Sequence, residues 1–291
     1  GIAATELLTA NKIDTVLFDG NKELDTAALY EKAPALKDVP LILGDLTDAQ
    51  MDEFDVAVLS PGVPTDIPMV NSLRDKGVKI WGEIELAYTF GAGKIIAITG
   101  TNGKTTTTAL TGEIMKNCFS DVRVVGNIGI PYTSMVSGST DDTVTVAEIS
   151  SFQLETIDTF APKISAILNI TPDHLNRHHT MENYIKAKED ITKNQTADDF
   201  CILNYEDEVL RKFADECPAK VVFFSSARAL DEGFYLDGDV IMYAHDGQRD
   251  EVINVNDLNL LGKRNYENVM AACAMSVSFG VSMDKIVEIL K

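Results

Sequence analysis

The sequence predicts an α/β protein built from two doubly wound domains with mainly parallel sheets. Three observations predict this class. Short apolar runs alternate with amphipathic segments along the chain, which is the rhythm of βαβ units. A flexible Gly91-Ala92-Gly93 joint precedes a new buried strand. The chain has 291 residues, of which 45% are hydrophobic, enough for a core in each of two domains. We therefore expect domains at residues 1–93 and 94–291.

In the first domain, three apolar runs are expected to be strands with helical segments between them. These runs cover residues 15–18, 56–59 and 78–80. Strands separated by helices favour a parallel sheet, because each crossover returns the chain to the same edge.

The second domain repeats this pattern and ends differently. Its expected parallel strands cover residues 94–99, 122–125, 143–147, 164–169, 200–204 and 221–225. Asp237-Gly238-Asp239 then separates two apolar runs and predicts a hairpin turn, so residues 233–260 should form a small antiparallel flap. The tail at residues 266–290 is rich in alanine and has the apolar spacing of a helix.

Charge and cysteine content exclude several classes of protein. There are 25 Lys and Arg against 45 Asp and Glu, a net charge of -20, which argues against nucleic-acid and anionic-membrane partners. No apolar stretch approaches the roughly 18 residues of a membrane span, and no signal peptide is visible. The four cysteines form no CxxC pair, so neither a zinc knuckle nor a disulfide framework is expected and a cytoplasmic location fits best.

The segment that follows the strand at 94–99 has the composition of a phosphate-binding loop. It reads Gly-Thr-Asn-Gly-Lys-Thr-Thr and leads into a helix. Gly100 and Gly103 allow backbone N–H groups to turn toward an anion, Lys104 can bridge phosphates, and the Thr105 hydroxyl can reach Mg²⁺. The strict P-loop pattern fails because residue 98 is Ile. By itself the loop would also suit a kinase or a GTPase, or form an ordinary glycine turn.

Several motifs together resemble the Mur ligase superfamily, which includes the folylpolyglutamate synthases. The loop is followed in the family's order by further matching segments, and the string at 148–155 is typical of the D-glutamate-adding branch. The matching segments are Ser60–Pro64, Gly82–Leu86, Gly100–Thr106, Gly126–Pro131, Glu148–Glu155 and Leu168–His178.

The resemblance implies an ATP-dependent amide-bond ligase of peptidoglycan synthesis. Such an enzyme adds D-glutamate to UDP-N-acetylmuramoyl-L-alanine through an acyl phosphate, using ATP and two Mg²⁺ ions. Residues 1–93 would bind the UDP substrate and residues 94–291 would bind ATP. The family's first strand and its third, D-glutamate-binding domain are not represented in the sequence, so we expect this chain to be inactive alone.

The resemblance also implies roles for catalytic and metal-binding residues. Lys104, His174 and Lys188 would be catalytic, with Lys188 carried as a carbamate. Glu148 ends a predicted strand, where α/β sheets place ligands, and its carboxylate suits Mg²⁺. The implied metal ligands are Thr105, Glu148, His174 and Lys188.

Substrate-binding residues are likewise implied by position in the matching motifs. The muramoyl group would contact Asn127, Ser150 and Gln153, although such residues also occur in turns and caps. The uridine diphosphate would contact Asp19, Gly20, Asn21, Ser60, Pro61 and Gly62, which turn formation alone could also explain. The nucleotide would contact Gly100, Thr101, Asn102, Gly103, Lys104, Thr105, Thr106, Asn265 and Asn268, the last two near adenine.

Three departures from the family pattern and two rival functions remain. Pro172 and Asn176 replace residues that are often acidic, and Arg264 stands where His is common. The rivals are another Mur or folylpolyglutamate-type ligase, and a nucleotide-binding module without catalysis. The segment 150–153 speaks against the first, and the metal and lysine set speaks against the second.

Overall fold

The computed structural model describes residues 1–127, 129–258 and 263–291, with only the backbone at Lys263 and Arg264. The parts of the predicted motifs at Ile128, Leu261 and Gly262, and the Arg264 side chain, lie outside the described residues.

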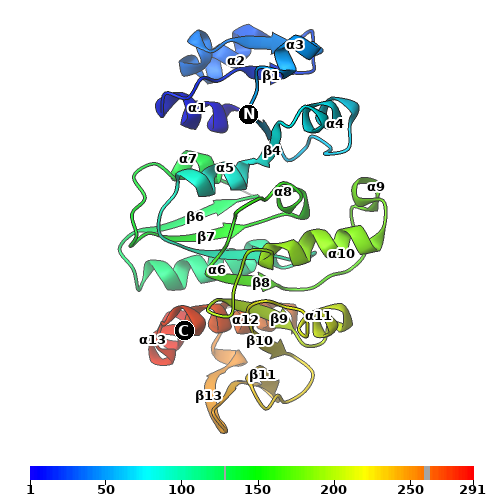
Figure 1. The fold of residues 1–291 in the computed structure, drawn as a ribbon. Coiled ribbons are helices and arrows are strands. Elements are labelled where there is room, and N and C mark those ends of the chain that lie inside the picture. The colour runs from blue at the N-terminus through cyan, green and yellow to red at the C-terminus, as the bar shows by residue number, and fades with distance from the viewer. Residues whose placement is uncertain (128, 259–262) are drawn as a thin grey trace.

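One large sheet forms the centre of the molecule (Figure 1). It has nine strands in the order β13-β12-β11-β10-β9-β8-β5-β7-β6. The six strands predicted from 94 to 225 are present and pair in parallel. They are β5 (Lys94–Thr99), β6 (Val122–Gly126), β7 (Val144–Glu148), β8 (Ile164–Ile167), β9 (Phe200–Asn204) and β10 (Lys220–Ser225).

Helices cover both faces of this sheet, which confirms the doubly wound arrangement predicted for this part of the chain. One core contains side chains of α6 (Lys104–Lys116), α12 (Lys263–Phe279) and α13 (Met283–Leu290). The opposite core contains side chains of α5 (Glu83–Phe90), α7 (Tyr132–Met135), α8 (Ser151–Leu154), α10 (Met181–Glu189) and α11 (Glu208–Phe213). Strand β5 supplies both cores, with Ile96 and Ile98 on one face and Ile95 and Ala97 on the other.

The antiparallel segment predicted at 233–260 is present, but it extends the central sheet. Strand β11 (Gly233–Asp237) pairs in parallel with β10, and β12 (Val240–His245) and β13 (Gln248–Asn254) follow antiparallel. The predicted turn lies where Asp237 pairs with Val240, and Gly238 has a positive φ of 56°. Buried Phe234 and Ile241 join the core that contains α12, so hydrophobic burial attaches this segment to the sheet.

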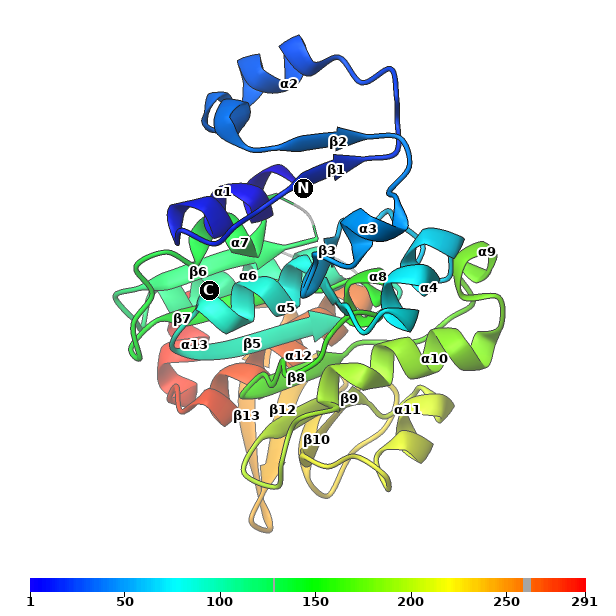
Figure 2. The ribbon, with the colours of Figure 1, turned by 45° about the horizontal axis from the view of Figure 1, so that its top comes forward.

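The first ninety residues form two separate two-stranded parallel sheets rather than one (Figure 2). Strand β1 (Leu17–Asp19) pairs with β2 (Leu41–Leu43), and β3 (Val56–Leu59) pairs with β4 (Lys79–Gly82). Strand β2 was not predicted. The helices of this part are α1 (Ile2–Ala10), α2 (Thr26–Lys32), α3 (Asp48–Met51), α4 (Pro68–Asp75) and the 3-10 helix η1 (Pro34–Asp38).

Two helices of the first ninety residues pack on the central sheet. Leu7 of α1 and Ile84 and Leu86 of α5 belong to the same core as Ile95 of β5. The carboxylate of Glu85, also on α5, is fully buried and accepts hydrogen bonds from the backbone N–H groups of residues 158–160. These contacts fix α5 over the sheet that holds the phosphate loop.

The remaining described elements are short, and the C-terminal tail is divided. The helix predicted over 266–290 is interrupted at Gly280, whose φ of 104° is left-handed, giving α12 and α13. Helix α9 (Leu175–His178) and the 3-10 helices η2 (Asp190–Thr192) and η3 (Val255–Asp257) complete the described fold. In the described part of the chain, no helix combines the length and apolarity that crossing a membrane requires.

Candidate active site

The phosphate loop joins β5 to α6 as the sequence predicts. Gly100 has a φ of 150° and Gly103 a φ of 87°, in the region that favours glycine. A Cβ atom at Gly103 would lie 2.5 Å from the Asn268 Oδ1 atom, which also leaves no room for a side chain. Residues 100–103 therefore form a tight turn that brings backbone N–H groups to the N-terminus of α6.

A cavity of about 280 Å³ opens over this loop. All of its lining residues belong to the set predicted from sequence. They are Thr101, Asn102, Gly103, Lys104, Thr105, Thr106, Asn127 and Glu148. The loop and the end of β7 thus meet around one cavity, although more than forty residues separate Thr105 from Glu148 in sequence.

Two lysines bind the same carbonyl oxygen of the loop. The Nζ atoms of Lys104 and Lys188 each donate a hydrogen bond of 2.9 Å to the Gly100 carbonyl. Lys104 also donates to the Thr101 carbonyl at 3.0 Å. The two Nζ atoms therefore share one acceptor, the Gly100 carbonyl oxygen of the phosphate loop.

Burial changes the proton affinity of both lysines. Lys188 is only 2% exposed, and burial together with the nearby Lys104 charge lowers its pKa from 10.5 to about 7. Burial also lowers the pKa of Lys104, while Glu148 and Asp173 oppose that change. Lys188 thus has a substantial neutral amine fraction near pH 7.

Glu148 is buried at the end of β7 and lines the cavity. Its Oε1 atom accepts a hydrogen bond of 3.1 Å from the Asn127 side chain, and its backbone carbonyl accepts one from Asn127 N–H. Asn127 therefore orients this carboxylate, which adds a contact within the protein to the substrate contact predicted from sequence.

His174 lies on a strained turn after β8. Its φ of 51° is left-handed for a non-glycine residue, and its side chain is 51% exposed. The ring lies 4.9 Å from the Phe152 ring and next to the Asp173 carboxylate. His178, four residues on, is buried between Ser151 and Glu155, and burial lowers its pKa.

Ser150 and Gln153 form the capping box of α8. The Ser150 Oγ atom accepts from Gln153 N–H, and the Gln153 side chain accepts from Ser150 N–H. This motif provides acceptors for backbone N–H groups at the start of the helix, so both residues have a structural role. It leaves Gln153 at the wall of a second, narrow pocket.

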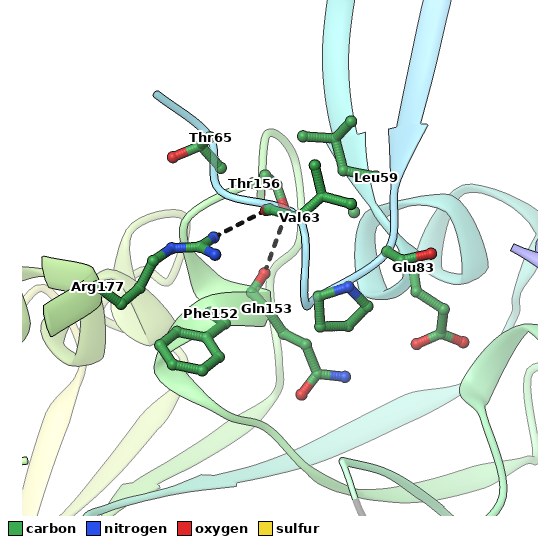
Figure 3. A pocket seen from close by; sticks show the side chains of 11 residues that line it. Leu59, Val63, Thr65, Glu83, Phe152, Gln153, Thr156 and Arg177 are labelled. Carbon is green, nitrogen blue, oxygen red and sulfur yellow. Dashed lines mark hydrogen bonds between the residues drawn. The ribbon is translucent and has the colours of Figure 1, made fainter. Parts of the chain in front are cut away.

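The second pocket lies between the first ninety residues and the central part (Figure 3). Ser60 and Pro61 line it from one side, and Phe152, Gln153 and Arg177 from the other. Arg177 crosses the gap, donating to the Val63 carbonyl at 3.0 Å and to Glu155 at 2.7 Å. The loop predicted to bind uridine diphosphate is thereby tied to the helix predicted to contact the muramoyl group.

The other predicted binding residues are less closely assembled. Asp19 accepts a hydrogen bond from Asn21 N–H in a turn after β1, and Asp19, Gly20 and Asn21 are not among the lining residues of the two pockets above. Gly62 is exposed beside Pro61. Asn268 is buried against Gly103, while Asn265 lies one turn earlier on α12.

Several contacts at the site were not predicted from sequence. Asn169 binds the backbone of the phosphate loop at Asn102, and Thr101 Oγ1 lies 3.0 Å from the Tyr184 hydroxyl. Asn169 lies two residues beyond the end of β8, the strand beside β5, whereas the sequence pattern placed it inside a strand expected over 164–169. The sequence pattern did not mark Asn169 as a contact of the loop, because the adjacency of the two strands was not readable from sequence.

The donor set near the cavity fits Mg²⁺ and a nucleotide phosphate. Glu148 and Thr105 offer the oxygen ligands that Mg²⁺ prefers, beside a glycine loop and a lysine. Within the described residues, no three His, Cys, Asp or Glu side chains group closely enough to hold a metal. An ion here would thus rely on few protein ligands plus phosphate and water, as Mg²⁺ commonly does.

Comparison with known proteins gives one family. The Mur ligase middle domain matches residues 98–276. The chain is 54% identical over 288 residues to the "UDP-N-acetylmuramoylalanine--D-glutamate ligase" of Lachnoclostridium phytofermentans, covering 99% of this chain and 63% of that protein. It is 53% identical to the protein of the same name from Lachnospira eligens, covering 100% of this chain and 64% of that protein. The chain therefore spans somewhat less than two thirds of these relatives.

Solved structures show the same fold at low sequence identity. The MPL ligase from Neisseria meningitides is 15% identical with a TM-score of 0.61, covering 99% of this chain and 93% of that chain. MurF from Acinetobacter baumannii is 17% identical with a TM-score of 0.58, covering 94% of this chain and 58% of that chain. With the domain match and the phosphate-loop cavity, these similarities lead to one conclusion: the chain belongs to the Mur ligase family.

Proposed function

We propose that this chain carries the precursor-binding and ATP-binding parts of a ligase that adds D-glutamate to UDP-N-acetylmuramoyl-L-alanine. The observation that carries the proposal is the cavity in which the phosphate loop, Lys104 and the buried Glu148 face one another. The names of the relatives support the substrates. Because the chain spans 63% of the first relative, the reaction is proposed for the complete protein.

The phosphate loop is suited to hold the β- and γ-phosphates of ATP. The N-terminus of α6 leaves backbone N–H groups without helical partners, and these attract anions. Lys104 would exchange its two loop carbonyls for a phosphate oxygen. Asn268, packed against Gly103, and Asn265 would lie toward adenine.

Glu148 and Thr105 would hold one Mg²⁺, and His174 with a modified Lys188 a second. Bound Mg²⁺ supplies positive charge that offsets the charge developing on phosphoryl oxygens. Asn127 would keep the Glu148 carboxylate turned toward the cavity.

The proposed reaction has two steps. A carboxylate oxygen of the L-alanyl group bonds to the γ-phosphorus of ATP while the bond to ADP breaks, which gives an acyl phosphate. The D-glutamate nitrogen then bonds to the acyl carbon, phosphate leaves with the bonding electrons, and the amine loses a proton. Closely placed cationic groups such as Lys104 stabilise the first step, in which charge passes from one anion to another.

The Ser60–Gly62 loop and the Asp19–Asn21 turn would bind the uridine diphosphate. The muramoyl group would then reach Ser150, Gln153 and Asn127 across the pocket that Arg177 bridges. Residues 1–93 and 94–291 are the corresponding domains in this proposal. A cytoplasmic location belongs to it as well, and the free thiols of all four cysteines agree with a reducing compartment.

The carbamate at Lys188 is supported by its burial and its position beside the phosphate loop. A neutral amine attacks CO₂, forms an N–C bond and releases one proton, so the side chain becomes an anion. Its lowered pKa, about 7, provides the neutral amine. Lys188→Ala in the complete protein should lose ligase activity and regain part of it with a small added carboxylic acid. Undiminished activity without rescue would refute the modification.

The test of the function is a ligation assay on the complete protein. It is incubated with ATP, Mg²⁺, UDP-N-acetylmuramoyl-L-alanine and D-glutamate, and phosphate and the new dipeptide precursor are both measured. We expect one phosphate released per amide formed. Replacing D-glutamate by meso-diaminopimelate or L-glutamate should give no product. Product with another amino acid would assign the protein to a different branch of the family, and ATP binding without ligation would make it a binding module.

A further inference from the structure

The phosphate loop is held along its length by the segment that follows β8. Thr101 N–H donates to the Asn169 carbonyl at 2.9 Å. One residue on, Asn102 N–H donates to Asn169 Oδ1 at 2.9 Å, and Asn169 Nδ2 donates to the Asn102 carbonyl at 3.0 Å. The Thr101 hydroxyl donates to the Thr171 carbonyl and accepts from Thr171 N–H. Two loop residues thus bind this segment by backbone and side chain.

Asn169 makes three of these hydrogen bonds. Its backbone oxygen, side-chain oxygen and side-chain nitrogen are all used on Thr101 and Asn102. The paired bonds to Asn102 fix the orientation of both peptide groups of that residue. The N–H groups at the start of α6, which have no helical partner, then keep one direction toward the cavity.

The same segment leads directly to Asp173 and His174. Two residues after Thr171 the chain reaches Asp173 and His174. Asp173 acts electrostatically on both Lys104 and Lys188. The Asn169 side chain therefore fixes the peptide groups of Asn102, while the Asn169 carbonyl and Thr171 join Thr101 to the segment that leads to the His174 turn.

We propose that Asn169 is a positioning residue for nucleotide binding, because it holds Thr101 and Asn102 in the anion-binding conformation and locks them to the segment that carries Asp173 and His174. This inference rests on the proposed nucleotide site. It predicts that removing the Asn169 amide disorders the loop before ligand binds, so that part of the binding energy must restore its conformation.

Asn194 provides a matched control. Its Nδ2 atom donates to the carbonyls of Asp158 and Phe160, at 2.9 and 3.0 Å, and it is half-buried like Asn169. These carbonyls precede β8, whereas Asn169 follows it, so Asn194 lies at the other end of the strand. Asn194→Ala removes two side-chain to backbone hydrogen bonds without touching the phosphate loop.

The experiment measures MgATP binding by titration calorimetry and thermal unfolding by circular dichroism for five forms of this chain. These are wild type, Asn169→Ala, Asn169→Asp, Asn194→Ala and Lys104→Ala. Asn169→Asp keeps the acceptor for Asn102 N–H but replaces the donor with an anionic oxygen. Binding is measured at a temperature at which each form is folded.

We expect both alanine variants at Asn169 and Asn194 to lower the unfolding temperature by similar amounts. Of the asparagine variants, only those at Asn169 should weaken ATP binding, by roughly tenfold, since they alone release the loop, and Lys104→Ala should weaken it by removing a phosphate contact. Asn194→Ala should bind like wild type. ATP affinity that is unchanged in Asn169→Ala and Asn169→Asp would overturn this inference alone. Absence of ATP binding by wild type, or undiminished binding by Lys104→Ala, would overturn the proposed nucleotide site as well.

Discussion

The protonated form of Lys188 is destabilised by its position in the site. Its side chain is 2% exposed, and among the described residues its hydrogen bond goes to the Gly100 carbonyl. A buried ammonium beside a second ammonium is unfavourable, so the native state binds this proton weakly. Tyr184 partly compensates, because the Lys188 Nζ atom lies 4.7 Å from its ring centre.

The first prediction concerns the pH dependence of stability. The pKa of Lys188 is about 7 in the folded chain and 10.5 ordinarily, so the unfolded chain holds the proton more strongly between these values. Burial of Lys188 therefore costs no free energy of unfolding above pH 10.5, where the amine is neutral in both states. The cost grows as the pH falls toward 7 and is complete below it. Lys188→Met, similar in length and uncharged, should be more stable than wild type near pH 7, with the difference narrowing as the pH rises.

Urea unfolding of both forms at a series of pH values measures this difference directly, with CO₂ excluded from the buffers so that the amine stays unmodified. Other titrating groups are common to both forms and cancel. A difference in unfolding free energy that stays constant with pH would show that Lys188 keeps its ordinary proton affinity.

Sequence predicted the residues of the cavity well, because most of them lie in one contiguous motif. Gly100 to Thr106 follow a strand and start a helix, so their geometry is local. Glu148 was implied by the family resemblance, and its place at the end of a predicted strand supported that role. The roles of Asn169 and Arg177 could not be predicted, because each depends on which segments become neighbours after folding.

At the scale of elements, helix α5 joins the first ninety residues to the central sheet. Its apolar residues Ile84 and Leu86 enter the central core, and its Glu85 carboxylate holds the loop at 158–160. Glu83, the first residue of α5, accepts a hydrogen bond from the Thr133 N–H group at the start of α7. The motif at 82–86, matched from sequence as a family feature, thus has a structural explanation in these contacts.

The second prediction is that Glu85→Ala destabilises the protein strongly. It removes the acceptor from the backbone N–H groups of Asp158, Thr159 and Phe160, of which only the bond to Phe160 is fully buried. At about 1–3 kcal/mol for the buried Phe160 N–H, and less for the two N–H groups that water can reach, the loss should be about 2 kcal/mol or more. Glu85→Gln, which keeps one carboxyl-like oxygen, should cost less.

Glu182→Ala is the matched control, since Glu182 also lies in the first turn of a helix but is exposed. It should change the free energy of unfolding by less than about 0.5 kcal/mol. The three variants are compared by denaturant titration. Equal midpoints for Glu85→Ala and Glu182→Ala would show that the buried carboxylate contributes nothing to holding α5.

The long, buried strands were predicted from sequence, and so were the short strands β1, β3 and β4, but β2 and the attachment of β11 to the central sheet were not. Strand β5 and its parallel partners have continuous apolar runs, which local patterns identify. Strand β2 has only three residues between Pro40 and Gly44, too few for a pattern to stand out. The attachment of β11 to β10 depends on burial of Phe234 and Ile241 in a distant core, and a hairpin signal carries no information about its neighbour.

Across the whole molecule, burial is distributed very unevenly. Every residue of β7 is buried, and all of β5 after Lys94, whereas no residue of β1 or β2 is fully buried.

The third prediction is that backbone amides of β5 and β7 exchange with deuterium far more slowly than those of β1 and β2. Mass spectrometry of peptic peptides measures this. Similar exchange rates in the two regions would mean that the chain opens as a single unit.

The alternation along β5 also determines how accurately the phosphate loop is placed. Ile96 and Ile98 face one core and Ile95 and Ala97 the other. A slip of one residue against β7 or β8 would turn every one of these side chains to the wrong face and move Gly100 by about 3.3 Å. That displacement exceeds the length of the hydrogen bonds that the loop accepts from Lys188 and donates to Asn169. The hydrophobic pattern of one strand therefore sets the alignment of the polar groups that follow it.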